Sequence, residues 1–503
     1  MVDIPANSTT TAMFEGALGT SSVPAFATFS DQLEVSGDRD WIKIELEAGV
    51  IYEFHMHFQN SVVPASGGDS MLRIYNSNGV IVASNNDRAD GDQNSYVSFI
   101  APTTGTYFVE ASEFGDDRVG DYSILFMESD GLTNHILDGT DNTYTGTPDQ
   151  RILGGRGDDT ITLGEANDAL GEQGNDTITG NDLDNRISGG LGDDIIQGGG
   201  GKDYLFGDAG TDTIVGGSSA DYLWGGSGDD TLFGNTESDV LYGGTGNDKL
   251  FGGDGFDHFI GGPGVDEMYG GNDGDFFRLK GNESIDDTFR GGAGIDCMQL
   301  DGGAPVTLRN FDAQISEVEA WDGNGLGLFG TSGANTFNFA AIDEVKLLPF
   351  IDGMGGNDKI TGSDFVDDLR GGSGNDTLKG GDGDDVLTGG AGRDVLTGGA
   401  DRDFFDFNKI SESKVGSQRD KIMDFKRGQD HIDLKNIDAK TGVGGNNKFK
   451  FIGKDDFGGT KGELRYEDNG SKVIVQGDVN GDGKADFEIY VKAGALSAGD
   501  FIL

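Results

Sequence analysis

The sequence predicts an all-β protein in which an N-terminal antiparallel β-sandwich is followed by a parallel β-roll solenoid and a β-rich C-terminal cap. Three observations predict this fold. A nonapeptide, G-G-x-G-x-D-x-U-x with U a large apolar residue, recurs from Gly154 to about Arg278 and again from Gly371 to Asp406. Short strand-like runs separated by turn signals fill residues 15–128, and residues 407–503 depart from the repeat. A fixed short period indicates a solenoid rather than a globule.

The composition limits what such a chain can do. Asp and Glu number 88 against 36 Lys and Arg, which leaves a formal charge of −52 over 503 residues. This charge excludes nucleic acid as an expected partner, and it opposes compaction unless something neutralises it. A single cysteine, Cys297, permits no intrachain disulfide, so bound metal is expected to stabilise the fold instead. The alternative is a disordered acidic chain, but 35% hydrophobic residues placed with a strict period argue against it.

Changes in pattern divide the chain into seven segments. The expected boundaries are a flexible N-terminus at 1–14, a β-sandwich at 15–128, a linker and first coil at 129–153, a first β-roll block at 154–299, longer metal-free solenoid coils at 300–352, a second β-roll block at 353–406 and a C-terminal domain at 407–503. No run approaches 18 apolar residues, so no transmembrane segment is expected.

The first large segment alternates as a half-buried sheet does. In the run 51–58, Tyr52, Phe54, Met56 and Phe58 share one face, which predicts a strand of a sandwich. The runs GDRDW at 37–41, AGVIY at 48–52, APTTGTY at 101–107 and GDYS at 120–123 resemble the bacterial pre-peptidase C-terminal domain. That resemblance implies a non-catalytic accessory module of secreted enzymes, sometimes calcium-bound and sometimes matrix-binding.

Two histidines of this segment, His55 and His57, share the other face of the same strand. They could hold a transition metal, or they could be solvent-facing polar positions. The second interpretation is favoured, because no third ligand with suitable spacing is visible.

The nonapeptide has the chemistry of a calcium turn. Glycines at its first, second and fourth positions permit left-handed backbone angles and leave carbonyl oxygens uncovered, and Asp at the sixth supplies a carboxylate. Calcium takes six or more oxygens, which one turn cannot supply. Two nonapeptides complete one coil, so every second turn lies on the same edge, about 4.8 Å from the next. The U residues, such as Leu232 and Leu250, would fill a thin core.

Segments such as Gly225–Phe233 and Gly243–Phe251 resemble the calcium-binding repeat of RTX proteins. This resemblance implies an ion between turns n and n+2, with many ions in all. The expected carboxylate ligands are Asp159, Asp168, Asp176, Asp194, Asp203, Asp212, Asp221, Asp230, Asp239, Asp248, Asp257, Asp266, Asp296, Asp358, Asp367, Asp376, Asp385, Asp394 and Asp403. The glycines expected to contribute are Gly226, Gly228, Gly244, Gly246, Gly372, Gly374, Gly381 and Gly383.

Some turns depart from the pattern, and weak or absent sites are expected there. Asn185 replaces the sixth-position Asp, while Ser219 and Glu237 replace the fourth-position Gly. The step from Leu170 to Ile178 is one residue short.

The last segment resembles the C-terminal domain of the serralysin proteases. The matching runs are 416–425, 430–434, 462–466, 477–487 and the terminal Asp500–Leu503. This resemblance implies export through a type I ABC secretion apparatus, with an uncleaved signal at the extreme C-terminus. It agrees with the lack of a basic and apolar leader at Met1–Met13. The expected location is extracellular.

A loop inside this segment, D-x-N-x-D-G, starts as an EF-hand does. Asp478, Asn480, Asp482 and Asp486 could form a looser calcium loop, although the twelfth position is Ile489 rather than Glu. A plain hairpin turn is the alternative.

The ninth position of the nonapeptide carries a second pattern. It should point outward, yet in the first block it reads Phe206, Val215, Trp224, Phe233, Tyr242, Phe251, Ile260 and Tyr269, whereas in the second it reads Thr361, Arg370, Lys379, Thr388 and Thr397. Contiguous exposed apolar surface often serves a partner. The alternative is that these rings pack over neighbouring turns or are covered by another part of the chain.

No catalytic motif is visible, so no enzyme is expected. None of the five histidines begins H-E-x-x-H, no G-x-S-x-G occurs, and Cys297 has no nearby histidine. A lyase or epimerase site at Glu317, Glu319 and Asp322 is the weaker alternative to a solvated strand face.

The favoured function is therefore a secreted, non-catalytic calcium-binding protein that attaches to a cell-surface polysaccharide, a matrix or a protein partner. The alternatives are an extracellular hydrolase or carbohydrate-active enzyme, and a self-assembling coat protein.

Overall fold

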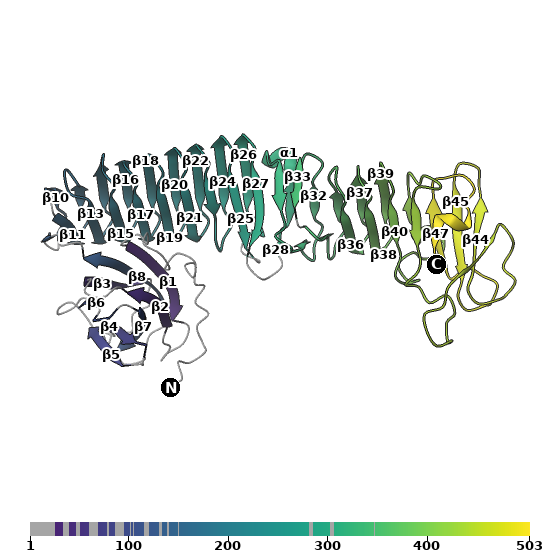
Figure 1. Cartoon of the computed structure of the whole chain (residues 1–503), viewed down its shortest axis with the longest axis horizontal. Coiled ribbons are helices and arrows are strands. Elements are labelled where there is room, and N and C mark those ends of the chain that lie inside the picture. Colours follow the sequence, from purple (N-terminus) through teal and green to yellow (C-terminus); the bar gives the residue numbers. More distant parts are fainter. Residues whose placement is uncertain are drawn as a thin grey trace. The chain divides into compact units, whose positions relative to one another are not determined.

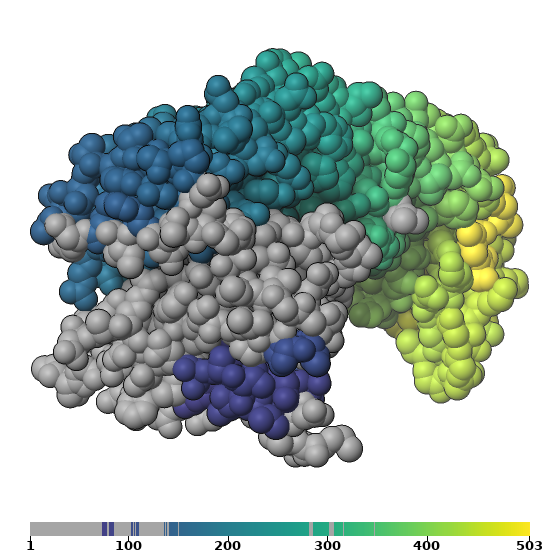
Figure 2. Space-filling view, turned by 60° about the vertical axis from the view of Figure 1, so that its left-hand side comes forward, coloured from purple at the N-terminus to yellow at the C-terminus, as the bar shows by residue number. Residues whose placement is uncertain are grey.

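The structure is a computed structural model of all 503 residues. It describes residues 26–33, 40–46, 51–59, 69–77, 80–85, 95–100, 102–103, 105–114, 120–129, 133–137, 140–148, 150–280, 285–301, 306–346 and 348–503. The other residues are grey in Figures 1 and 2. Two compact units, Met1–Lys249 and Leu250–Leu503, make up the chain, and each is described by itself.

The first unit begins with two four-stranded antiparallel sheets. One has the order β1-β8-β3-β6, with β1 (Phe26–Leu33), β8 (Gly120–Ser129), β3 (Ile51–Gln59) and β6 (Ser95–Ile100). The other has the order β2-β7-β4-β5, with β2 (Asp40–Leu46), β7 (Gly105–Phe114), β4 (Asp69–Asn76) and β5 (Ile81–Asn85). Ile74, Tyr107 and Val109 are buried within the second sheet. The alternating strand predicted at 51–58 is β3.

The repeat coils of this unit form two parallel sheets, because successive nonapeptides alternate between them (Figure 1). One sheet contains β9 (Thr133–Ile136), β11 (Gln150–Arg156), β13 (Asp168–Gln173), β15 (Arg186–Leu191), β17 (Tyr204–Ala209), β19 (Tyr222–Ser227) and β21 (Val240–Thr245). The other contains β10 (Thr143–Thr145), β12 (Thr160–Thr162), β14 (Thr177–Asn181), β16 (Ile195–Gly200), β18 (Thr213–Ser218) and β20 (Thr231–Thr236).

The register of these sheets places the U residues in columns. Leu205 pairs with Leu223 and Leu223 with Leu241 in one sheet, and Ile196 pairs with Ile214 in the other. All of them are fully buried. The core is thus one apolar side chain deep on each side. The all-β prediction with a parallel β-roll is confirmed.

Truncating one U residue is expected to destabilise the coils. Ile196→Ala should cost about 2–5 kcal/mol in free energy of unfolding, because it empties a fully buried site. The matched control is Ile195→Ala, since Ile195 lies next to it but is 45% exposed. That control should change the free energy by at most about 0.5 kcal/mol. Urea titration in saturating calcium measures both, and equal losses would contradict the assigned register.

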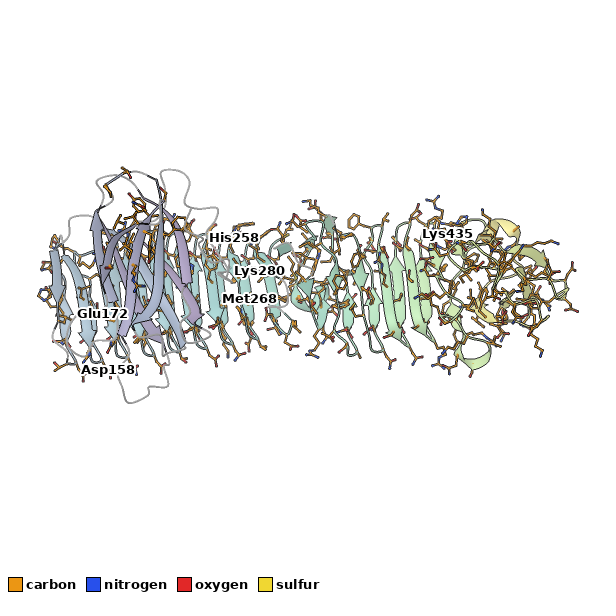
Figure 3. All side chains as sticks on the ribbon, turned by 90° about the horizontal axis from the view of Figure 1, so that it is seen from below. Asp158, Glu172, His258, Met268, Lys280 and Lys435 are labelled. Atoms are coloured by element: carbon orange, nitrogen blue, oxygen red, sulfur yellow. The ribbon has the colours of Figure 1, made fainter. Side chains whose placement is uncertain are left out.

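The second unit continues with coils of the same kind. One sheet holds β22 (Lys249–Asp254), β24 (Glu267–Asn272) and β26 (Thr288–Ala293), and the facing sheet holds β23 (His258–Ile260), β25 (Phe276–Lys280), β27 (Cys297–Asp301), β30 (Ala320–Asp322) and β33 (Glu344–Lys346). Met268, labelled in Figure 3, is a buried U residue of β24.

Between 306 and 361 the coils become three-sided. The chain runs from β27 to β28 (Val306–Thr307), β29 (Asn310–Asp312), the short helix α1 (Ala313–Ser316) and back to β30; then to β31 (Leu328–Phe329), β32 (Thr336–Asn338) and β33; then to β34 (Ile351–Asp352) and β35 (Lys359–Thr361). Strand partners now lie 24 or 23 residues apart, from Ala320 to Glu344 and from Leu328 to Ile351.

Larger side chains fill these three-sided coils. Phe311, Trp321 and Phe339 are buried and meet pairwise with ring centroids 4.9–5.0 Å apart. A third side encloses more volume than two facing sheets do, so Leu or Ile alone would leave cavities. The spacing of 23–24 residues makes these coils longer than the two-sided ones. The boundaries expected at 300–352 and the lack of metal there stay predictions.

The remaining strands form two sheets that run to the C-terminus. Two-stranded coils resume with β36 (Asp368–Gly374), β38 (Val386–Gly392) and β40 (Phe404–Asp406) in one sheet, followed there by β42 (His431–Asp433) and β47 (Phe501–Ile502). The other contains β37 (Thr377–Gly381), β39 (Val395–Gly399) and β41 (Asp420–Ile422), then β46 (Phe487–Val491), β45 (Val473–Asp478), β44 (Glu463–Asp468) and β43 (Lys450–Gly453). Pairing is antiparallel only between β44, β45 and β46, which close this end.

Helices contribute little to the described part of the chain. Besides α1 there are two single-turn 3₁₀ helices, Gly416–Gln418 and Ala498–Asp500. None of the helices among the described residues has the length and apolar character that a membrane crossing requires.

Candidate metal centre

The sixth-position side chains of the repeats form columns, each at the turn that precedes the strands of one sheet. In the first unit the two columns read Asp159, Asp176, Asp194, Asp212, Asp230 and Asp248, and Asn167, Asn185, Asp203, Asp221 and Asp239. In the second unit they read Asp266 and Asp287, and Asp257, Asp275 and Asp296. In the later coils the columns are Asn335, Asp358, Asp376, Asp394 and Asp420, and Asp367, Asp385, Asp403 and Asp430.

One carboxylate oxygen of most column aspartates joins successive coils. The backbone N–H of Asp194 donates to Oδ1 of Asp212 at 2.7 Å, and that of Asp212 donates to Oδ1 of Asp230 at 2.8 Å. The same bond runs from Asp358 to Asp376 at 2.7 Å. These bonds fix the rotamer of the accepting Asp and leave its second oxygen to point into the turn.

That second oxygen is buried without a hydrogen-bond partner. This holds for Oδ2 of Asp176, Asp194, Asp203, Asp212, Asp221, Asp230, Asp275, Asp296, Asp358, Asp376, Asp385, Asp394, Asp403 and Asp420. An ionised oxygen buried without a donor or a cation is strongly unfavourable. Repetition at the same atom of so many coils indicates a cation-binding position rather than a local defect.

The space beside this oxygen is built from carbonyls. A Cβ placed on Gly225 would collide with Oδ2 of Asp230 and with the carbonyl oxygen of Gly243, one coil further on. On Gly371 it would meet Oδ2 of Asp376 and the Gly389 carbonyl oxygen, both at 2.6 Å. Glycine is therefore required at the first position, because the side-chain space is already occupied by oxygens that converge from two coils.

Glycines at the second and fourth positions give each turn its shape. Gly226, Gly228, Gly244, Gly246, Gly372, Gly374, Gly381 and Gly383 all have positive φ, between 95° and 144°. Ser219 and Glu237, which replace fourth-position glycines, also have positive φ, at 96° and 73°. The backbone of these two turns therefore follows the others, and the weak sites expected there stay a prediction.

Burial raises the pKa of the column carboxyls, and the neighbouring Asp charges raise it further. The pKa of Asp194 and of Asp230 rises to about 9, with burial as the largest cause and Asp212 next. The pKa of Asp385 rises to about 8. A folded-state pKa above the unfolded value near 3.9 means that stability of the cation-free roll falls as pH rises between those values. At neutral pH the columns therefore need positive charge.

The donor set fits calcium. In most turns it includes a carboxylate oxygen and a main-chain carbonyl oxygen of the next coil, both of them ligands that this hard cation takes. Among the described residues, no three His, Cys, Asp or Glu side chains meet as a metal cluster. When bound, the ion would supply charge that offsets the columns and would tie one coil to the next.

The structure corrects the expected role of Asp168. Ala169 pairs with Ile152 and Ile187 and is therefore the U residue of its coil, so Asn167 holds the sixth position and Asp168 the seventh. The Asp168 carboxylate accepts from the buried Arg151 guanidinium at 3.4 Å. The short step accordingly lies before Ala169, not between Leu170 and Ile178 as expected.

Four column aspartates were missed by the sequence pattern. Asp275 follows Asp273 in place of the fourth-position Gly, Asp287 follows the irregular stretch 281–286, and Asp420 and Asp430 lie beyond the last nonapeptide. Their Oδ1 atoms accept the coil-to-coil bonds from Asp257, Asp266, Asp394 and Asp403. The shorter signal D-x-U followed by a strand would have found them.

The loop at 478–486 is a closed hairpin turn in this structure. Asp478 accepts from the N–H groups of Gly481 and Gly483, and Asp486 accepts from those of Val479 and Asn480. Asp482 accepts from Lys484 N–H. Because backbone donors already engage these carboxylates, the geometry favours the plain turn, and a calcium loop there stays a prediction.

Hydrogen bonds or burial explain the other candidate residues whose side chains are described. Glu319 continues an Asp column, since its Oε2 accepts from Asp296 N–H at 3.0 Å, and Asp322 accepts from Gln299 at 3.3 Å. Burial raises the pKa of the Cys297 thiol to about 11, which disfavours a nucleophilic thiolate. His55 and His57 belong to β3, but their side chains lie outside the described residues.

Comparison with known proteins confirms the three resemblances. The RTX calcium-binding nonapeptide repeat matches residues 144–178, 169–182, 179–214, 206–241 and 242–277. The bacterial pre-peptidase C-terminal domain matches residues 38–113. The C-terminal domain of the peptidase M10 serralysins matches residues 307–503, so it includes the three-sided coils and the second repeat block as well as 407–503. No curated protein matches the chain.

Solved structures resemble parts of the chain only loosely. The AlgE6R3 and AlgE6R2 subunits of the Azotobacter vinelandii mannuronan C5-epimerase are 29% and 28% identical, with TM-scores of 0.22 and 0.21. Each match covers 29% of this chain. It covers 77% of the AlgE6R3 subunit and 92% of the AlgE6R2 subunit. The catalytic unit of the GH87 α-1,3-glucanase of Streptomyces thermodiastaticus is 9% identical with a TM-score of 0.20, over 81% of this chain and 95% of that one. Such low scores support no functional argument.

Proposed function

We propose that this chain, which has the architecture of an RTX protein with a serralysin-type C-terminal domain, folds on extracellular calcium after type I export and then attaches to a surface, matrix or protein partner without catalysing a reaction. The matched domains indicate a secreted calcium-binding protein and include no catalytic peptidase domain. One observation carries the calcium part of the proposal: the buried, unpartnered Asp oxygens, repeated coil after coil beside converging carbonyls.

Export supports the same order of events. A type I channel passes an extended chain, and calcium is scarce inside cells. With dissociation constants of roughly 10⁻⁴ to 10⁻³ M, which are typical of extracellular calcium modules, the repeats would stay unfolded before export. Self-repulsion within a chain of charge −52 would hold them open until the ions arrive. The signal for this export is proposed to be the uncleaved C-terminus ending in Asp500–Leu503.

Retention on surfaces tests the attachment. The protein, loaded with calcium, is incubated with cell envelopes and matrix polysaccharide, washed, and eluted with EDTA. Retention that EDTA releases is the expected result. Turnover of a glycan or protein substrate would instead establish an enzyme, and calcium-driven ordered arrays would establish a coat protein.

The aromatic columns are the candidate contact surface. On one sheet Phe206, Trp224 and Tyr242 stack with centroids 4.4 and 5.5 Å apart, and on the other sheet Phe251 stacks on Tyr269 at 4.9 Å. All but Phe206 are half-buried. The rings stack on one another along each sheet and form an apolar band on its outer face. Arg370, Lys379, Thr388 and Thr397 at the equivalent positions of the second block make no such band.

Replacing two of these rings is expected to weaken attachment. Trp224→Ser combined with Phe233→Ser removes apolar surface outside the coil core and should lower retention about tenfold, as a loss of about 1.4 kcal/mol does. Binding isotherms on the retaining surface measure this, and circular dichroism follows calcium-induced folding. The control, Thr388→Ser with Thr397→Ser, should change neither. A large shift in the folding midpoint of the ring variant would show that the rings only brace the sheets.

A further inference from the structure

Four turns in the described coils differ from the rest at the sixth-position side chain. In these turns the oxygen that elsewhere has no partner accepts a hydrogen bond from the backbone N–H of the second-position residue. Asn181 donates to Oδ1 of Asn185 at 2.8 Å, and Thr331 donates to Oδ1 of Asn335 at 3.0 Å. Ser363 donates to Oδ2 of Asp367 at 2.8 Å, and Lys426 donates to Oδ2 of Asp430 at 2.7 Å.

Backbone conformation at the second position separates the two kinds of turn. Asn181, Thr331, Ser363 and Lys426 do not have positive φ, whereas the second-position glycines do. Residue type alone does not decide this. Glu172, Asp208 and Met354 also occupy second positions, and they have positive φ of 75°, 71° and 66°. In their turns Oδ2 of Asp176, Asp212 and Asp358 remains without a partner.

We infer that the second-position residue of each nonapeptide decides whether its turn takes calcium: left-handed backbone leaves the carboxylate oxygen open to the ion, and other backbone conformations close the turn with an N–H group. Four turns, at Asn185, Asn335, Asp367 and Asp430, are then calcium-free. This inference rests on the proposed calcium-dependent folding. It also corrects Asp367, which was expected to be a ligand.

Asp367 keeps both oxygens of an open turn, although Ser363 and Phe365 replace its second- and fourth-position glycines. The fourth position does not decide the state, because Gln418 holds it without positive φ in the turn where Oδ2 of Asp420 has no partner. Oδ2 of Asp367 and the carbonyl oxygen of Gly380 converge on the Cβ position of Gly362, as the equivalent atoms do in the open turns. This turn therefore has both oxygens that the open turns offer to an ion. However, Oδ2 accepts from both N–H and Oγ–H of Ser363, at 2.8 and 3.0 Å. In the next coil of the same edge, Gly381 has φ of 127° and Oδ2 of Asp385 is without a partner.

The physical reason is competition for one oxygen. An N–H group aimed at the carboxylate places the positive end of a dipole where the cation would sit, and it satisfies the charge with a charge-assisted hydrogen bond. Calcium would have to break that bond and turn the peptide. In the left-handed conformation the N–H points elsewhere, so the buried oxygen gains a partner only from the ion.

Opening the turn at Asp367 tests the inference. Ser363→Gly permits positive φ and removes the hydroxyl, so the chain should bind one more calcium ion than the wild type. The matched control is Ser363→Ala, which removes the hydroxyl but still disfavours left-handed backbone, and its ion count should equal that of the wild type. Native mass spectrometry in calcium counts the ions as integers on the full chain. Met354→Gly keeps a left-handed second position and should also leave the count unchanged.

The outcomes separate this inference from the proposed function. A wild-type chain that binds no calcium would overturn the proposed function itself. A calcium-loaded wild type with no extra ion in Ser363→Gly, or with an extra ion in Ser363→Ala, would overturn only the inference. If Ser363→Gly does not fold, Thr331→Gly with Asn335→Asp makes the same change in another coil and should again add one ion; no gain there would count equally against it.

Discussion

Removing calcium with EDTA is expected to abolish the β structure of the repeat coils. The repeat coils bury many carboxylate oxygens that have no donor, and their core is only one apolar side chain deep on each side. At a hundredfold excess over the dissociation constant, each independent site adds about 2.7 kcal/mol of stability. If on the order of 15 ions bind, about 30 of the 52 negative charges are offset by the charge they bring. The free energy lost when several sites empty at once exceeds the free energy of unfolding of an ordinary domain.

Circular dichroism in the far ultraviolet measures this loss, and excess calcium should restore the signal. Magnesium at the same concentration is the control. It prefers an octahedral shell that retains water, so it should restore little of the β signal. A spectrum that EDTA leaves unchanged would contradict calcium-dependent folding, since the columns would then be stable with their carboxylates unpaired.

The repeat fixes most of this fold because its period is visible. Alternation of D-x-U between two sheets places Leu205 above Leu223 and Asp212 above Asp230, and both columns follow from counting nine residues. Counting fails where the period breaks. Asp168 and Asn167 are adjacent and both polar, so only the pairing of Ala169 with Ile187 decides which holds the sixth position. A step of eight residues is compatible with either choice in the sequence alone.

The open and closed turns could not be told apart from composition. Glu172 and Ser363 both replace a second-position glycine, yet only Glu172 adopts positive φ. The energy difference between the two backbone conformations is small for a single residue, on the order of 1–2 kcal/mol, and coil-to-coil contacts decide it. The three-sided coils could not be predicted for a similar reason. The short strands at 306–361 lack the glycine-rich repeat, and their arrangement around Trp321 depends on side-chain packing.

A single methyl group placed at one proposed calcium site is expected to remove an ion and destabilise the coils. Gly225→Ala puts Cβ where Oδ2 of Asp230 and the Gly243 carbonyl oxygen lie. Both oxygens belong to hydrogen-bonded backbone or to a fixed rotamer, so neither can withdraw cheaply. The strain of overpacking should cost about 1–3 kcal/mol, and the displaced oxygens no longer converge on the ion. The expected result is one calcium fewer by native mass spectrometry and a lower unfolding midpoint in calcium.

Gly494→Ala is the control for the same change of residue. No atom lies within 4 Å of a Cβ on Gly494, and its φ is not left-handed, so ion count and midpoint should match the wild type. If Gly225→Ala also kept every ion, the carbonyl of Gly243 and the carboxylate of Asp230 could not both be ligands of one site. If it lost stability equally in calcium and in EDTA, the glycine would serve backbone packing alone. Loss of stability in calcium only is what an ion held between two coils requires, because in EDTA the coils it joins are already unfolded.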